Sequence, residues 1–116
     1  MGIKLSELMA GRCERRIPFG DQALTVGYRP YAEHEEEAIL ARHGGIWTNA
    51  AVRDFLATFV ADWDLTDDDG APLPREAEAL RAVSMDILGP IFLDIRNSLN
   101  PPTLTSGPKS VSSLAG

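Results

Sequence analysis

Residues 49–64 read NAAVRDFLATFVADWD, and their apolar side chains recur at the three- and four-residue spacings of a helix with one buried face. The members of this face are Val52, Phe55, Leu56, Phe59, Val60 and Trp63. Thr48 or Asn49 can cap the first turn with a side-chain oxygen. The pattern predicts a helix over residues 49–64, and no other segment of the chain shows a stronger periodicity.

Three further helices are predicted on either side of this segment. Residues 31–43 are rich in helix formers, carry their acidic side chains in the early turns, and end before the pair that begins at Gly44. Residues 75–83 and 86–99 follow a loop rich in Asp and Pro. Pro90 can kink the last helix or mark a fresh start within it.

Residues 13–29 predict a β-hairpin. Ile17 and Phe19 alternate with polar residues before a Gly-Asp pair, and a second alternating run follows that pair. The apolar members of the second run are Leu24, Val26 and Tyr28. Pro18 lacks a backbone N–H, so the strand that contains it is expected at the edge of a sheet.

These elements predict an α+β fold that is mainly α, in which the N-terminal hairpin precedes a compact bundle of about four helices. Residues 1–99 are expected to form a single globular domain. Residues 100–116 are rich in Pro, Ser, Thr and Gly, so they are expected to form an extended tail that is flexible or ordered by a partner.

Charge and hydropathy exclude several classes of partner. The net charge is −6, and residues 1–30 carry five basic and three acidic groups, so the remainder of the chain carries −8. Such a surface repels nucleic acid. The longest mainly apolar stretch, residues 87–95, is much shorter than the roughly 20 residues that span a bilayer. With no signal-peptide pattern and Cys13 as the single cysteine, we expect a cytoplasmic protein without membrane partners or disulfides.

The sequence contains no convincing catalytic or metal site. Residues 65–76 resemble a calcium loop, but the first position is Leu65, which offers no ligand oxygen. His34 begins a segment like a zinc-protease helix, but Ala38 stands where the second histidine is needed. Cys13 has no histidine near it in the sequence. We therefore predict no enzymatic activity, no cofactor and no metal, with a small regulatory enzyme or a metal-dependent switch as a remaining alternative.

Binding to another chain is the function that these residues favour. The predicted core is thin, so part of the apolar face of the last helix is expected to form a groove for a partner. Three consecutive glutamates are either a solvated face or an electrostatic docking patch. The candidate partner-binding residues are Leu88, Ile91, Phe92, Ile95, Leu99, Glu35, Glu36 and Glu37.

Residues 52–74 read VRDFLATFVADWDLTDDDGAPLP, and this run resembles the tail assembly chaperones of long-tailed, siphovirus-type bacteriophages. Members of that family typically carry a helix ending in a Trp-Asp-Leu-like element, then an acidic Gly-x-Pro-Leu-Pro loop and further helices. Residues 3–10 (IKLSELMA) and 18–30 (PFGDQALTVGYRP) are similar to the family's N-terminal hairpin region. The resemblance spans roughly residues 3–99.

The resemblance implies a factor made in the infected host cytoplasm and absent from the finished virion. Such chaperones bind the long helical tape measure protein, keep it soluble and help to recruit tail tube subunits, and self-association is possible. In many phages a ribosomal frameshift extends the C-terminus, a junction that residues 100–116 would suit. The alternative is a small structural tail or neck protein that is retained in the virion.

Overall fold

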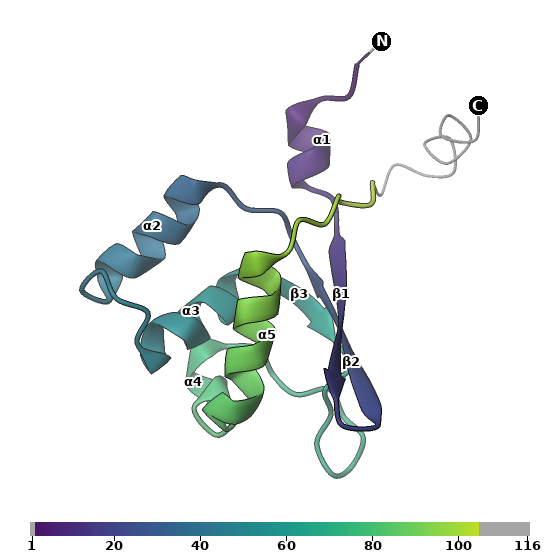
Figure 1. Cartoon of the computed structure of the whole chain (residues 1–116), viewed down its shortest axis with the longest axis vertical. Helices are drawn as coiled ribbons and strands as arrows, with labels where there is room; N and C mark the ends of the chain where they lie inside the picture. The colour runs from purple at the N-terminus through teal and green to yellow at the C-terminus, as the bar shows by residue number, and fades with distance from the viewer. Residues whose placement is uncertain (1, 105–116) are drawn as a thin grey trace.

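A computed structural model describes residues 2–104 of the chain and shows an α+β fold that is mainly α (Figure 1), which confirms the predicted fold class. The sheet is antiparallel, with strand order β1-β2-β3. The elements in chain order are α1 (Leu5–Met9), β1 (Cys13–Phe19), β2 (Gln22–Tyr28), α2 (Glu33–Arg42), α3 (Asn49–Phe59), β3 (Val60–Trp63), α4 (Ala77–Leu80) and α5 (Met85–Asn97).

The hairpin forms where the alternation predicts it. β1 and β2 pair from Cys13 opposite Tyr28 to Phe19 opposite Gln22, with a two-residue turn between them. Gly20, the first turn residue, has a φ of 65°, a left-handed conformation that glycine adopts without steric cost. β1 is an edge strand, so the position expected for Pro18 is confirmed.

The helix predicted over residues 49–64 is wrong in its last turn, because α3 ends at Phe59 and β3 follows at once. Val60 lies opposite Tyr28 and Trp63 opposite Val26, with an irregularity in register between them. This bulge lets two residues that are three apart both reach the core, with exposures of 5% and 8%. The same spacing suits one face of a helix, which is why the periodicity concealed the strand.

The remaining helices differ from the prediction mainly in length. The helix expected over residues 75–83 is reduced to α4, and the Arg75 side chain instead donates to the backbone oxygen of Val60 at 3.1 Å. α5 keeps Pro90 inside one continuous helix, and Ser84 caps its start by accepting from the N–H of Asp86 at 3.1 Å. α1 is a short additional helix ahead of the hairpin.

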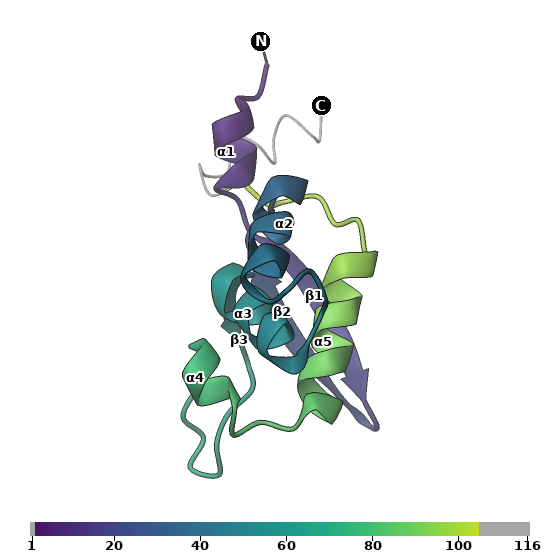
Figure 2. The ribbon, with the colours of Figure 1, turned by 90° about the vertical axis from the view of Figure 1, so that its left-hand side faces the viewer.

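α2, α3, α4 and α5 lie on one side of the sheet (Figure 2), and α3 lies at the centre of this layer. α3 packs against α2, α4 and α5, while α5 also packs against β1. Phe55 of α3 is fully buried and meets the rings of Tyr31, Trp47, Phe59 and Phe92 at centroid distances of 4.9 to 5.7 Å. This aromatic cluster joins the helical layer to the end of the sheet.

On the other face of the sheet, the side chain of Arg12 lies across Gly27, where an added Cβ would collide with the guanidinium group. The guanidinium donates to Asp62 at 2.6 Å and to Glu14 at 2.7 Å. Gly27 therefore gives Arg12 the room to connect β1 with β3 through these ion pairs.

The first part of the predicted tail returns to the sheet. The backbones of Thr103 and Arg12 exchange two hydrogen bonds, of 2.7 and 3.0 Å, and the side-chain amide of Asn100 donates to the backbone oxygen of Glu14. The expectation of an extended tail over residues 105–116 lies outside the described residues. Within residues 2–104, no helix has the length and apolar character needed to cross a membrane.

Candidate binding surface

Most of the apolar face that was predicted to form a groove is in the core. Leu88 and Ile91 are completely buried, and Ile95 and Phe92 are 1% and 4% exposed. The prediction of an exposed groove built from these four side chains is therefore wrong for this fold. The physical reason is that α5 packs on both α3 and β1, so the sheet and the helical layer together cover the face.

Two of the three consecutive glutamates are used inside the molecule. Glu35 accepts from Arg29 at 2.8 Å and from the N–H of Ala32 at 2.8 Å, which completes the start of α2. The hydrogen bond from Arg29, followed by that from Ala32, lowers the pKa of the Glu35 carboxyl. Glu36 pairs with Arg96 of α5 at 2.7 Å. Glu37 alone of the three is classed as exposed, so these glutamates mainly hold α2 in place.

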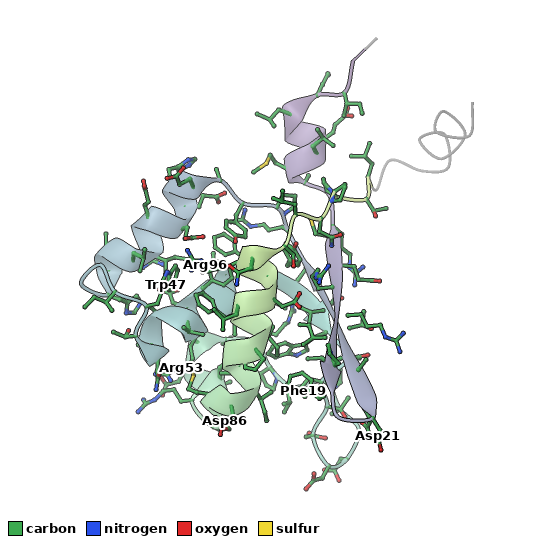
Figure 3. All side chains as sticks on the ribbon, viewed as in Figure 1. Phe19, Asp21, Trp47, Arg53, Asp86 and Arg96 are labelled. Carbon is green, nitrogen blue, oxygen red and sulfur yellow. The ribbon has the colours of Figure 1, made fainter. Side chains whose placement is uncertain are left out.

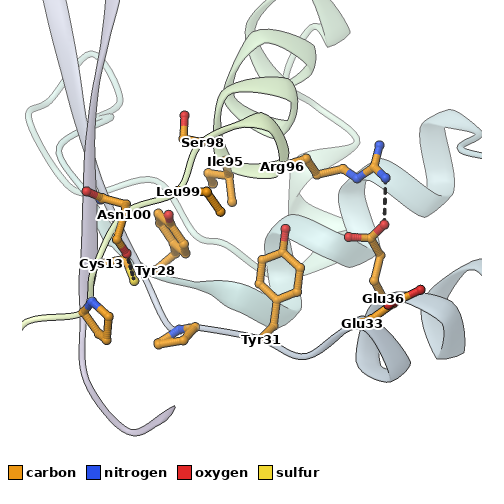
Figure 4. Close-up of a pocket in the computed structure, with 12 residues that line it drawn as sticks. Cys13, Tyr28, Tyr31, Glu33, Glu36, Ile95, Arg96, Ser98, Leu99 and Asn100 are labelled. Atoms are coloured by element: carbon orange, nitrogen blue, oxygen red, sulfur yellow. Dashed lines mark hydrogen bonds and ion pairs between the residues drawn. The ribbon is translucent and has the colours of Figure 1, made fainter. Parts of the chain in front are cut away.

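A pocket of about 620 Å³ opens between the end of β2, the start of α2 and the C-terminal end of α5 (Figure 4). We call it the tyrosine pocket. Its lining residues are Cys13, Tyr28, Pro30, Tyr31, Glu33, Glu36, Ile95, Arg96, Ser98, Leu99, Asn100 and Pro102. Three residues singled out from the sequence, Glu36, Ile95 and Leu99, are among them.

The inner part of the tyrosine pocket consists of side chains that are buried or half-buried and carry a hydroxyl or a thiol. Tyr28 and Cys13 are 4% and 3% exposed, and the Cys13 thiol donates to the backbone oxygen of Asn100 at 3.1 Å. Burial, followed by the charge of Glu36, raises the pKa of the Tyr31 hydroxyl to about 12. Burial also raises the pKa of the Cys13 thiol. Both groups therefore stay protonated at neutral pH, which makes the thiol a poor nucleophile.

The rim combines charge with one exposed apolar side chain. The guanidinium group of Arg96 lies over the rings of Trp47 and Phe92, at 5.0 and 5.5 Å from their centroids, and pairs with Glu36. Figure 3 shows Arg96 close to Trp47. Leu99, which follows α5, is 100% exposed. An apolar side chain from another molecule can thus contact Leu99 on entering the pocket and meet polar groups beside it.

A second pocket of about 510 Å³ lies at the other end of the hairpin, between its turn and the start of α5. We call it the hairpin groove. Its apolar lining consists of Phe19, Ala23, Leu24, Leu65 and Ile87, and its polar lining of Gln22, Asp64 and Thr66. Figure 3 shows Phe19 and Asp21 together at this end of the molecule.

Neither pocket brings a histidine next to a thiol. The described residues that form them include no histidine, and the single thiol is protonated and hydrogen-bonded. In the calcium-like loop, Asp67 accepts from the backbone N–H groups of Asp69 and Ala71, at 2.8 and 3.0 Å. Across residues 2–104, no three His, Cys, Asp or Glu side chains gather where they could hold a metal ion.

Sequence reasoning missed the residues that give the tyrosine pocket its character. Tyr28 appeared only as one member of a strand pattern, and Tyr31 only as the start of a helix. The available signal was the residue type, because a tyrosine combines a large apolar ring with a hydroxyl that can hydrogen-bond. The sequence did not indicate a role for Arg96 in this pocket, since its partners Trp47 and Glu36 are distant in the sequence.

In comparisons with known proteins, no protein-family model, no curated protein and no solved structure matched the chain.

Proposed function

We propose that this chain is a phage tail assembly chaperone, which binds the tape measure protein in the host cytoplasm, keeps it soluble and helps to recruit tail tube subunits. The observation that carries the proposal is the tyrosine pocket, an open recess with a mixed polar and apolar lining and with the fully exposed Leu99 at its mouth. The similarity of residues 52–74 to such chaperones supports the same function.

The pocket suits a helical partner with an apolar face. A large apolar side chain, such as Leu or Phe, can contact Leu99 and the half-buried prolines of the lining while neighbouring polar groups of the partner meet Glu33 and the hydroxyl of Tyr31. Tape measure proteins are long helical chains with such faces, which aggregate when they are bare. One recess engages only a few side chains, so many copies of the chaperone are needed along one partner.

The net charge of −6 supports the same role, because a strongly charged chaperone keeps the complex dispersed. The charge also resists nonspecific association between complexes that each carry exposed apolar surface. A small acidic chain is therefore a suitable cover for an apolar helix during assembly.

Co-expression with the tape measure protein of the same genome tests the proposal. Leu99→Asp introduces a charge at the pocket mouth without disturbing the core, because Leu99 is 100% exposed. Ile46→Asp is the matched control, since Ile46 is 67% exposed on the connection between α2 and α3, outside the pocket lining. We expect wild type and Ile46→Asp to keep the tape measure protein soluble, and Leu99→Asp to lose at least half of the soluble fraction.

Equal solubility of the partner with all three chains would overturn the assignment of the tyrosine pocket. Failure of the wild-type chain to solubilise or co-purify with the tape measure protein would overturn the proposed function itself. Mass spectrometry of purified virions then separates the two phage roles. A chaperone is absent from virions, whereas a structural tail or neck protein is present in a fixed ratio to the tube subunit.

A further inference from the structure

The N-terminal arm, residues 2–11, exposes apolar side chains that the fold does not cover. Ile3 is 61% exposed and Leu5 is 72% exposed, and none of the five residues of α1 is buried. A helix of five residues is not stable by its own hydrogen bonds, because helices this short depend on packing. The arm therefore gains stability when another surface covers Ile3 and Leu5.

The hairpin groove is the apolar recess that this arm fits. Its lining includes Phe19, Leu24, Leu65 and Ile87, none of them charged, so it can accept the side chain of a leucine or isoleucine. Burying two apolar surfaces against each other, when both are otherwise open to water, lowers the free energy.

The charge of Lys4 is complementary to that of the groove. Residues 17–28 and 60–74, which contain most of the groove lining and the adjoining loop, contain six aspartates and no Lys or Arg. Asp64 is itself part of the lining. In the arm, Lys4 stands between Ile3 and Leu5, and Glu7 in the first turn of α1 makes residues 2–11 neutral overall, so the complementary charge is that of Lys4 alone. A basic group between two apolar side chains matches an apolar recess with an acidic surround.

The arm of one molecule cannot reach its own groove. α1 and the turn between β1 and β2 lie at opposite ends of the hairpin (Figure 1), and the groove is lined by residues beside that turn. The extended chain from Gly11 to Phe19 covers about 26 Å. From Gly11 back to Leu5, a helical arm reaches only about 9 Å. The groove that it fits therefore belongs to a second copy of the chain.

We propose that this chain self-associates head to tail, with Ile3, Lys4 and Leu5 of one copy seated in the hairpin groove of the next. The contact is heterologous, because an arm meets a groove and each added copy leaves one of each free. Such a contact builds strings or rings and does not stop at a dimer. It is independent of the proposed function, since it needs only this chain.

Sedimentation equilibrium of the purified chain tests the association over a range of concentrations. We expect the average mass of the wild type to rise past that of a dimer, and the rise to weaken as salt screens Lys4. Leu5→Asp disables the arm and Ile87→Lys disables the groove, so each variant alone is expected to stay monomeric. Leu93→Asp is the control, because Leu93 is 52% exposed and lies outside both the arm and the hairpin groove. We expect this variant to assemble like the wild type.

Mixing the two disabled variants gives the decisive result. The intact arm of the Ile87→Lys chain fits the intact groove of the Leu5→Asp chain, so an equimolar mixture forms dimers and nothing larger. Thr66→Lys, on the exposed rim of the groove, replaces Ile87→Lys if circular dichroism shows that the latter does not fold. A wild-type mass that stays monomeric, variants that assemble like wild type, or a mixture that stays monomeric would each overturn the proposal.

Discussion

Replacing Phe92 with alanine distinguishes a core role from a partner-binding role for the buried face of α5. The ring is 4% exposed and meets Trp47 and Phe55 at centroid distances of 4.8 and 5.0 Å. Removing a buried phenylalanine ring loses its transfer free energy and leaves a cavity, which together cost about 3–5 kcal/mol. Domains of this size are stable by about 5–15 kcal/mol, so the loss is a large part of the total.

Urea unfolding followed by circular dichroism measures this loss as a lower midpoint with an unchanged slope. Leu93→Ala is the matched control, since Leu93 is the next residue of α5 and is 52% exposed. Its free energy of unfolding should change by no more than about 0.5 kcal/mol. If Phe92→Ala costs less than about 1 kcal/mol, the ring is not packed as described, and the placement of this face in the core is refuted.

Two further changes test contacts that tie distant segments together. Gly27→Ala should push the Arg12 guanidinium away from Asp62. Because Arg12 holds the pKa of the Asp62 carboxyl below its ordinary value, that pKa should rise in the variant when it is measured by NMR titration. An unchanged pKa of Asp62 would contradict the contact. Burial alone would raise the pKa of Asp54, but hydrogen bonds from His43 and then Arg42 outweigh it and lower that pKa. A carboxyl whose pKa is lowered by folding stabilises the fold at pH values above its unfolded-state pKa of about 4. This stabilisation is lost as the pH falls through the pKa of the folded state. Asp54→Asn should therefore be less stable than wild type at neutral pH and lose less on acidification, and parallel pH profiles would contradict this.

The helices and strands were predicted from local sequence patterns. These predictions were reliable where the structure of a segment depends only on residues within that segment. Alternation and a Gly-Asp turn determine the hairpin, because a two-residue turn sets the strand register. Helix formers and an N-terminal cap determine α2 and the first part of α3. In these segments the nearest neighbours in the sequence are also the nearest in space.

Local patterns failed where a residue's partner lies far away in the chain. Val60 and Trp63 fit a helix as well as a bulged strand, and only the free edge of β2 decided for the strand. Likewise, Glu36 and Arg96 are 60 residues apart, so nothing near either one indicated that they pair.

The sequence by itself determined the α+β class, the hairpin and its register, and which helix faces are apolar, because these depend on periodicity and turn chemistry. Only the tertiary structure decided which apolar surface remains open. α5 packs between α3 and β1 and buries the face that had been expected to bind a partner, while the tyrosine pocket, the hairpin groove and the N-terminal arm stay exposed. Burial depends on what covers a surface, and the covering residues come from distant parts of the chain.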